Sequence, residues 1–94
     1  MITKRDLIRE IQEDTRLKKS DVSSVIDSFI RIVEESLKDG DSVQLLSFGT
    51  FKTEIRKPRI GRNVVKGETL HIPGKIIPVF KPGDRLKRVV TKDI

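Results

Sequence analysis

Residues 43–51, Val-Gln-Leu-Leu-Ser-Phe-Gly-Thr-Phe, decide the fold, because the spacing of the apolar residues changes here from helical to alternating. Alternation over this length predicts a β-strand. Gly49 interrupts the alternation, which predicts a tight turn or bulge at this residue and a second strand beyond it. A chain that is helical before this segment and β after it belongs to the α+β class.

Two helices are predicted before this segment. Thr3 and Asp6 match an N-terminal capping pattern, and the apolar residues that follow predict a helix over roughly 3–14. A second helix is predicted over about 19–38, where apolar residues recur at helical spacing until Gly40. Its apolar face is broader than one short neighbouring helix covers, in a chain that is only 35% hydrophobic. Self-association is therefore expected.

A long hairpin is predicted after the first strand. The second strand is expected to continue to Ile60, although its high polar content and Pro58, which cannot donate to a ladder, exclude it from a core sheet. Residues 61–67 predict a flexible turn, and residues 68–79 predict a return strand at an edge. A hairpin of this composition cannot bury itself, so we expect a partner to order it.

The chain is short enough to form one domain over 1–94. Within it, residues 1–47 are expected to form a helical base and the first strand, and residues of about 52–76 to form the arm. A short C-terminal helix is predicted over 83–91, with Asp84 as its cap.

The positive charge is concentrated in one half of the chain. The net charge is +6, yet residues 1–47 carry −2 and residues 48–94 carry +8. Residues 52–75 are the most basic, with seven basic side chains against two acidic ones. Such a cluster is typical of a surface that binds a polyanion, and a merely solvated surface stays open as the alternative.

Several classes of protein are excluded by the composition. The absence of cysteine rules out disulfide, zinc-finger and thiol chemistry, and no apolar run is long enough for a signal peptide or a membrane span. His71 has no triad around it, and Glu34 and Glu35 are interpreted as a solvated helix face. We therefore expect a soluble intracellular protein that is not an enzyme and holds no metal or cofactor.

A set of residues spread over nearly the whole chain carries a resemblance to a known family. These residues are Gly40-Asp41, Val43, Leu45, Ser47-Phe48-Gly49-Thr50-Phe51, Arg56, Arg59, Gly61-Arg62-Asn63, Gly67-Glu68, Ile72-Pro73, Pro78, Phe80-Lys81, Gly83 and Leu86-Lys87. The chain resembles the bacterial histone-like DNA-binding proteins of the HU and integration host factor family. The joint presence of 47–51 and 61–63 at this spacing makes the resemblance specific.

The resemblance implies an intertwined dimer. Two N-terminal helices per chain would form a helical base, a three-stranded antiparallel sheet would extend into a long β-ribbon arm, and a short C-terminal helix would close the chain. It implies a non-enzymatic architectural protein of the cytoplasmic nucleoid, which binds and bends or wraps double-stranded DNA with its arms in the minor groove and with low sequence specificity. A homodimer like HU is expected. A sequence-preferring subunit of a heterodimer like integration host factor stays open, as does a dimeric module that binds RNA or an acidic protein.

The resemblance also implies which residues contact DNA. They are Arg56, Lys57, Arg59, Arg62, Asn63, Val64, Val65, Lys66 and Lys75 on the arm, and Lys4, Lys81 and Lys87 on the body. Family members usually carry a proline wedge directly after Gly-Arg-Asn, where this chain has Val64. Valine is apolar and stiff enough to insert between bases but lacks the fixed backbone of proline. Either Val64 acts as the wedge, or Val64 and Val65 are tip residues and bending is weaker.

Overall fold

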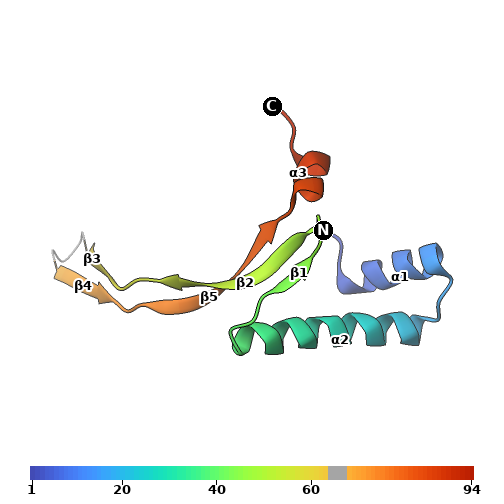
Figure 1. Cartoon of the computed structure of the whole chain (residues 1–94), viewed down its shortest axis with the longest axis horizontal. Coiled ribbons are helices and arrows are strands. Elements are labelled where there is room, and N and C mark those ends of the chain that lie inside the picture. The colour runs from blue at the N-terminus through green and yellow to red at the C-terminus, as the bar shows by residue number, and fades with distance from the viewer. Residues whose placement is uncertain (64–67) are drawn as a thin grey trace. The chain divides into compact units, whose positions relative to one another are not determined.

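The computed structural model describes residues 1–63 and 68–94, which divide into two compact units, Met1–Glu35 and Ser36–Ile94. The elements are α1 (Lys4–Thr15), α2 (Lys19–Lys38), β1 (Val43–Leu45), β2 (Gly49–Arg56), β3 (Arg59–Asn63), β4 (Glu68–Ile72), β5 (Lys75–Pro82) and α3 (Asp84–Val90) (Figure 1). The order and type of these elements confirm the predicted α+β class. Within the described residues, no helix combines the length and the apolar character needed to cross a membrane.

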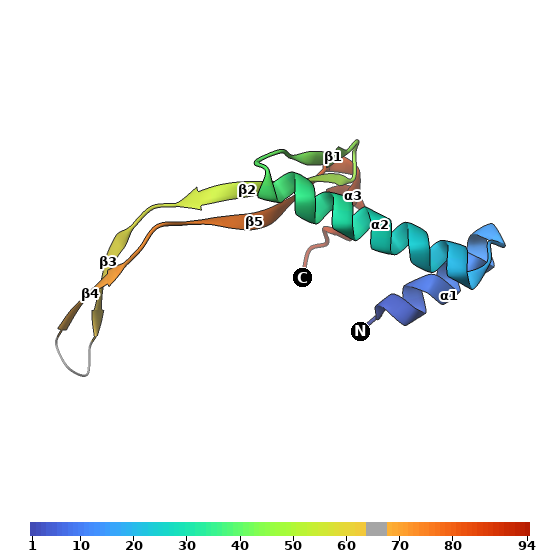
Figure 2. The same ribbon diagram turned by 90° about the horizontal axis from the view of Figure 1, so that it is seen from below.

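The first unit is a helical hairpin made by α1 and most of α2 (Figure 2). Both helices lie within a residue of their predicted bounds. Among the described residues, the buried hydrophobic side chains are Ile8 and Val22, which are 7% and 2% exposed. Other apolar side chains of α2 remain in water, since Val25 is 64% and Ile32 is 49% exposed. The structure therefore has the surplus apolar helix surface that the sequence predicted.

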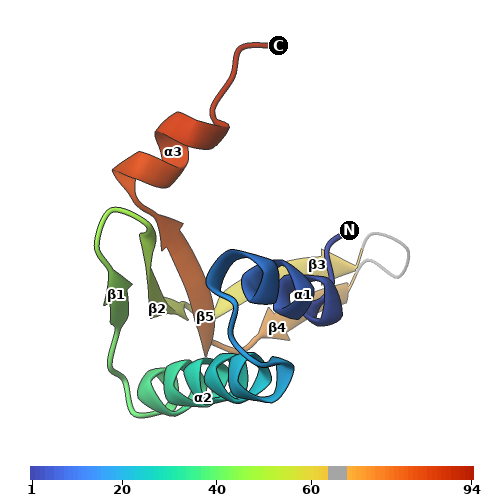
Figure 3. The ribbon, with the colours of Figure 1, turned by 90° about the vertical axis from the view of Figure 1, so that its right-hand side faces the viewer.

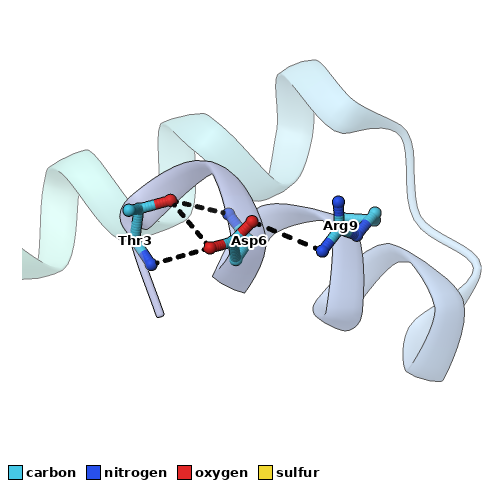
Figure 4. A network of polar contacts seen from close by, with 3 residues as sticks. All are labelled: Thr3, Asp6 and Arg9. Carbon is cyan, nitrogen blue, oxygen red and sulfur yellow. Dashed lines mark hydrogen bonds and ion pairs between the residues drawn. The ribbon is translucent and has the colours of Figure 1, made fainter. Parts of the chain in front are cut away.

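A capping box fixes the start of α1, as the sequence predicted. The Thr3 hydroxyl accepts a hydrogen bond from the Asp6 backbone N–H at 3.3 Å, and the Asp6 carboxylate accepts one from the Thr3 backbone N–H at 3.0 Å (Figure 4). The carboxylate also accepts a hydrogen bond from the Thr3 hydroxyl at 3.0 Å and lies 3.3 Å from Arg9. The backbone hydrogen bond from Thr3, then the hydroxyl and the Arg9 charge, lower the pKa of Asp6 below its ordinary value of 3.8.

We expect Asp6→Asn to lower the melting temperature at neutral pH and to do so less in acid. A carboxyl group whose pKa falls on folding stabilises the fold above its unfolded pKa, and this contribution disappears as the pH falls through the folded pKa. Thermal unfolding at neutral pH and below about pH 4 measures the difference. Glu10→Gln removes a carboxylate of α1 that lies outside the capping box and serves as the control. A destabilisation by Asp6→Asn that does not shrink in acid would contradict the prediction.

The end of α1 is strained. Arg16 caps the helix in the left-handed conformation, with φ 62° and ψ 22°, and its N–H donates to the Gln12 carbonyl at 2.7 Å. A side chain in this conformation costs about 1 kcal/mol, which glycine avoids. Arg16→Gly is therefore expected to raise the free energy of unfolding by about 1 kcal/mol in urea denaturation. Arg16→Ala also loses the charge but keeps the strain, so equal stabilisation by both variants would contradict the backbone explanation.

The second unit contains a three-stranded antiparallel sheet in the order β1-β2-β5 and a two-stranded antiparallel sheet, β3-β4. The ladder between β2 and β5 is complete, from Gly49 opposite Pro82 to Arg56 opposite Lys75. Figure 3 shows the three strands and α3, which follows β5, and Figure 1 shows β3 and β4 continuing from β2 and β5 as a two-stranded ribbon. The predicted three-stranded sheet that extends into a ribbon is confirmed.

The turn between β1 and β2 lies before Gly49, so the prediction that Gly49 forms it is wrong. The Phe48 N–H donates to the Leu45 carbonyl at 3.0 Å, and Ser47 takes the positive φ of 68°. Gly49 is instead the buried first residue of β2, where a Cβ would lie 2.6 Å from Cε1 of Phe80. Glycine is needed at this position for the close approach of an aromatic ring, and the turn conformation falls to Ser47.

Both segments of the long hairpin are interrupted at the same level. Residues 57–58 and 73–74 lie outside the ladders that flank them. Pro58 and Pro73 have no backbone N–H to donate, so neither ladder continues through them. The predictions of a continuous second strand and a continuous return strand are therefore wrong. The predicted turn also begins too early, because β3 extends to Asn63.

The final helix is joined to the β1–β2 turn by backbone hydrogen bonds. The Gly83 N–H donates to the Phe48 carbonyl at 2.7 Å, and the Arg85 N–H donates to the Ser47 carbonyl at 3.2 Å. Gly83 is the N-cap of α3 and no side chain caps it, so the prediction that Asp84 is the cap is wrong. Asp84 lies in the first turn, where its negative charge complements the helix dipole.

Candidate nucleic-acid interface

The β2–β5 ladder has one charged and one uncharged face, because side chains alternate along each strand. The charged face is formed by Thr50, Lys52, Glu54 and Arg56 of β2 with Lys75, Ile77, Val79 and Lys81 of β5. The uncharged face is formed by Gly49, Phe51, Thr53 and Ile55 of β2 with Ile76, Pro78, Phe80 and Pro82 of β5. A polyanion has cations to bind only on the charged face.

Aromatic packing occupies one end of the uncharged face. Phe51 and Phe80 are cross-strand partners whose ring centroids are 4.9 Å apart, and the Phe48 ring lies 5.6 Å from that of Phe80. The tilted arrangement of both pairs is typical of favourable aromatic contacts. These phenylalanines hold the sheet and the turn together and so have the structural role that the sequence indicated.

Four of the candidate residues surround one concave site where the ribbon is interrupted, which we call the arm hollow. The arm hollow has a volume of about 420 Å³ and is lined by Glu54, Ile55, Arg56, Lys57, Arg59, Ile72, Pro73 and Lys75. Arg56, Lys57, Arg59 and Lys75 are all exposed, against one carboxylate. Arg56 and Lys75 are direct cross-strand partners, and like charges in this position repel each other. An anion placed between them removes that repulsion, so the hollow is suited to a phosphate group.

Two further candidates, Lys81 and Lys87, meet at a second hollow of about 190 Å³, beside the β1–β2 turn and the start of α3. Gln44 and Thr50 also line this hollow, and the ladder register places Thr50 between Gln44 and Lys81. Sequence reasoning missed Gln44 and Thr50 as members of the site. Only the pairing register of three strands brings these four polar side chains together.

Lys4 lies in the helical unit and forms an ion pair with Asp27 of α2. Both side chains are about half exposed, at 49% and 57%. Lys4 must therefore exchange this carboxylate for any phosphate that it binds. Sequence reasoning did not find Asp27, and nothing local pointed to it, because the partners are 23 residues apart.

The remaining candidates are only partly covered by the structure. Arg62 and Asn63 occupy the last two register positions of β3, opposite Thr69 and Glu68. Val64, Val65 and Lys66 lie outside the described residues. The two alternatives for Val64, wedge or tip residue, therefore remain predictions.

Comparison with known proteins finds matches over almost the whole chain. The family model described as "Bacterial DNA-binding protein" matches residues 2–91. The DNA-binding protein HU of Thermus thermophilus is 43% identical over 91 residues, which are 97% of this chain and 94% of that protein. The integration host factor subunit beta of Xanthomonas campestris is 37% identical over 91 residues, 96% of this chain and 88% of that protein.

Among solved structures, the cocrystal structure of Anabaena HU with DNA matches with a TM-score of 0.80 at 28% identity. The match covers 93% of this chain and 96% of that chain. The described fold is therefore that of a HU protein, from the helical hairpin to α3.

Proposed function

The chain belongs to the bacterial DNA-binding protein family that includes HU and integration host factor, and from this premise we propose that it is a non-enzymatic architectural protein that binds and bends double-stranded DNA. Its DNA contacts are mainly to phosphates, and its sequence preference is low. The protein works in the cytoplasmic nucleoid and needs no cofactor or small-molecule substrate.

The arm hollow is the observation that carries this proposal. It brings together Arg56, Lys57, Arg59 and Lys75, which come from two strands and the segment between them. Four exposed cations around one concave site can neutralise neighbouring phosphates, and such contacts give affinity without reading the sequence. Lys81 and Lys87 add a second cationic contact on the same unit.

Bending is assigned to the end of the arm. In minor-groove architectural proteins, an apolar side chain partly unstacks one base step, and the bent duplex then wraps more protein surface. We assign this role to Val64, beside the contacts of Arg62, Asn63, Val65 and Lys66. The minor groove chiefly distinguishes A·T from G·C pairs, which is consistent with weak sequence preference.

The working form is a homodimer. The exposed apolar side chains of α2 and the small number of buried ones support a second copy as the missing half of the core. In this dimer residues 1–47 form the base and first strand, the arm spans about 52–76, and 83–91 close the single domain.

The proposal is tested by fluorescence energy transfer between the ends of a short duplex, plain and nicked, with analytical ultracentrifugation of the protein and its complex. A dimer that shortens the end-to-end distance supports the proposal. Val64→Ala should lose the bend and Val64→Pro should keep it, with similar affinity. Tight binding to a duplex that stays straight would indicate a protein that coats DNA without bending it. Equal competition by RNA of the same length would favour an RNA-binding module instead.

Asp27→Asn is expected to increase the affinity for duplex DNA severalfold. The substitution releases Lys4 from its ion pair, so Lys4 no longer exchanges a carboxylate for a phosphate. The salt dependence should steepen at the same time, by up to about 0.9 in the slope of log affinity against log salt for each added phosphate contact. Binding titrations at several salt concentrations measure both effects. Lys4→Gln with Asp27→Asn should return the slope to that of Lys4→Gln alone, and a steeper slope in this double variant would contradict the explanation.

A further inference from the structure

Two isoleucines form an exposed apolar patch on the uncharged face of the ribbon. Ile55 and Ile76 are direct cross-strand partners, and they are 79% and 69% exposed. A β-branched pair of this kind stabilises the ladder, but the mutual contact leaves most of both side chains in water. Their neighbours on the same face, Thr53 and Pro78, carry no charge. The patch is therefore apolar without interruption along this part of the arm.

The patch lies on the side of the ladder opposite to the cations. Arg56 and Lys75 are the adjacent residues in sequence, and alternation places them on the charged face. A duplex held by the charged face leaves the uncharged face in solvent. DNA binding by the proposed mode thus leaves Ile55 and Ile76 uncovered.

The patch is too small to hold a partner without help. Two isoleucine side chains offer far less than the roughly 800 Å² per partner that a stable interface buries. A contact of this size becomes effective only where something else holds the partner close, as a shared duplex does by raising the effective concentration. Each copy on that duplex presents the same patch, and two identical apolar patches are complementary to each other in an isologous contact.

We propose that Ile55 and Ile76 form a contact between neighbouring copies bound to one DNA duplex, so that the protein binds long DNA cooperatively. The inference rests on the proposed function and adds a protein–protein contact to it. The occupant of the patch is the patch of the next copy, packed face to face as in two stacked sheets.

The test compares a duplex that holds one dimer with a duplex several times longer, using the double variant Ile55→Thr and Ile76→Thr. Threonine keeps the β-branched shape and removes most of the apolar contact. On the long duplex the cooperativity parameter should fall about tenfold, which corresponds to about 1.4 kcal/mol. On the short duplex the affinity should not change. Ile60→Thr is the matched control, because Ile60 is 71% exposed on the same arm but lies in β3, outside the patch.

Three results would overturn the proposal: unchanged cooperativity in the double variant, non-cooperative binding of the natural protein to long DNA, or a lower melting temperature of the free double variant, which would place the patch inside the protein's own fold. Ile55 also borders the arm hollow, so a loss of affinity on the short duplex would mean a DNA contact and overturn it too. Failure of the natural protein to bind the short duplex would refute the proposed function itself.

Discussion

Arg56→Gln with Lys75→Gln is expected to weaken binding to duplex DNA about a hundredfold, because each side chain gives up a charge-assisted contact of about 1.5 kcal/mol. The two residues are cross-strand partners at the arm hollow, so both contacts are lost at one place. The slope of log affinity against log salt should flatten by about 0.9 for each phosphate contact removed. All duplex sequences should lose affinity to a similar extent, since phosphate contacts carry no sequence information.

Titrations of several duplex sequences at several salt concentrations measure these effects. Lys18→Gln with Lys19→Gln is the matched control, because it removes the same charge from the start of α2 and leaves the arm intact. If this control weakens binding as much, net charge and not the arm hollow determines affinity. If only some sequences lose affinity, Arg56 or Lys75 reads bases.

Gly49→Ala is expected to lower the free energy of unfolding by about 3 kcal/mol. The new methyl group would lie 2.6 Å from Cε1 of Phe80 and 2.8 Å from the Lys81 carbonyl oxygen. The Phe80 ring is held between Phe48 and Phe51, so it cannot withdraw without breaking that packing. Urea denaturation at one fixed protein concentration measures the loss, since the stability of a dimer depends on concentration.

Gly40→Ala separates packing from backbone strain. Gly40 has a φ of 85°, and nothing lies within 4 Å of a Cβ built there. Only the conformational cost of about 1 kcal/mol is therefore expected. Equal losses at the two glycines would contradict the packing explanation for Gly49.

The candidate site could be predicted in its membership better than in its arrangement. Arg56, Lys57, Arg59 and Lys75 were assigned from a resemblance, and they surround one hollow. That Arg56 faces Lys75 follows from a register that no local pattern contains. Val64 lies outside the described residues, so the wedge remains a prediction.

The sequence by itself determined the helices, the change to β structure after Gly40 and the concentration of positive charge in the second half, because helical spacing, alternation and composition are local properties. Only the tertiary structure decided that Gly49 is packed against Phe80, that Lys4 is paired with Asp27, and that the ribbon has separate charged and uncharged faces. The reason is physical. Close packing and strand register join residues that are far apart in the chain, and a shift of register by one residue would move every side chain to the other face.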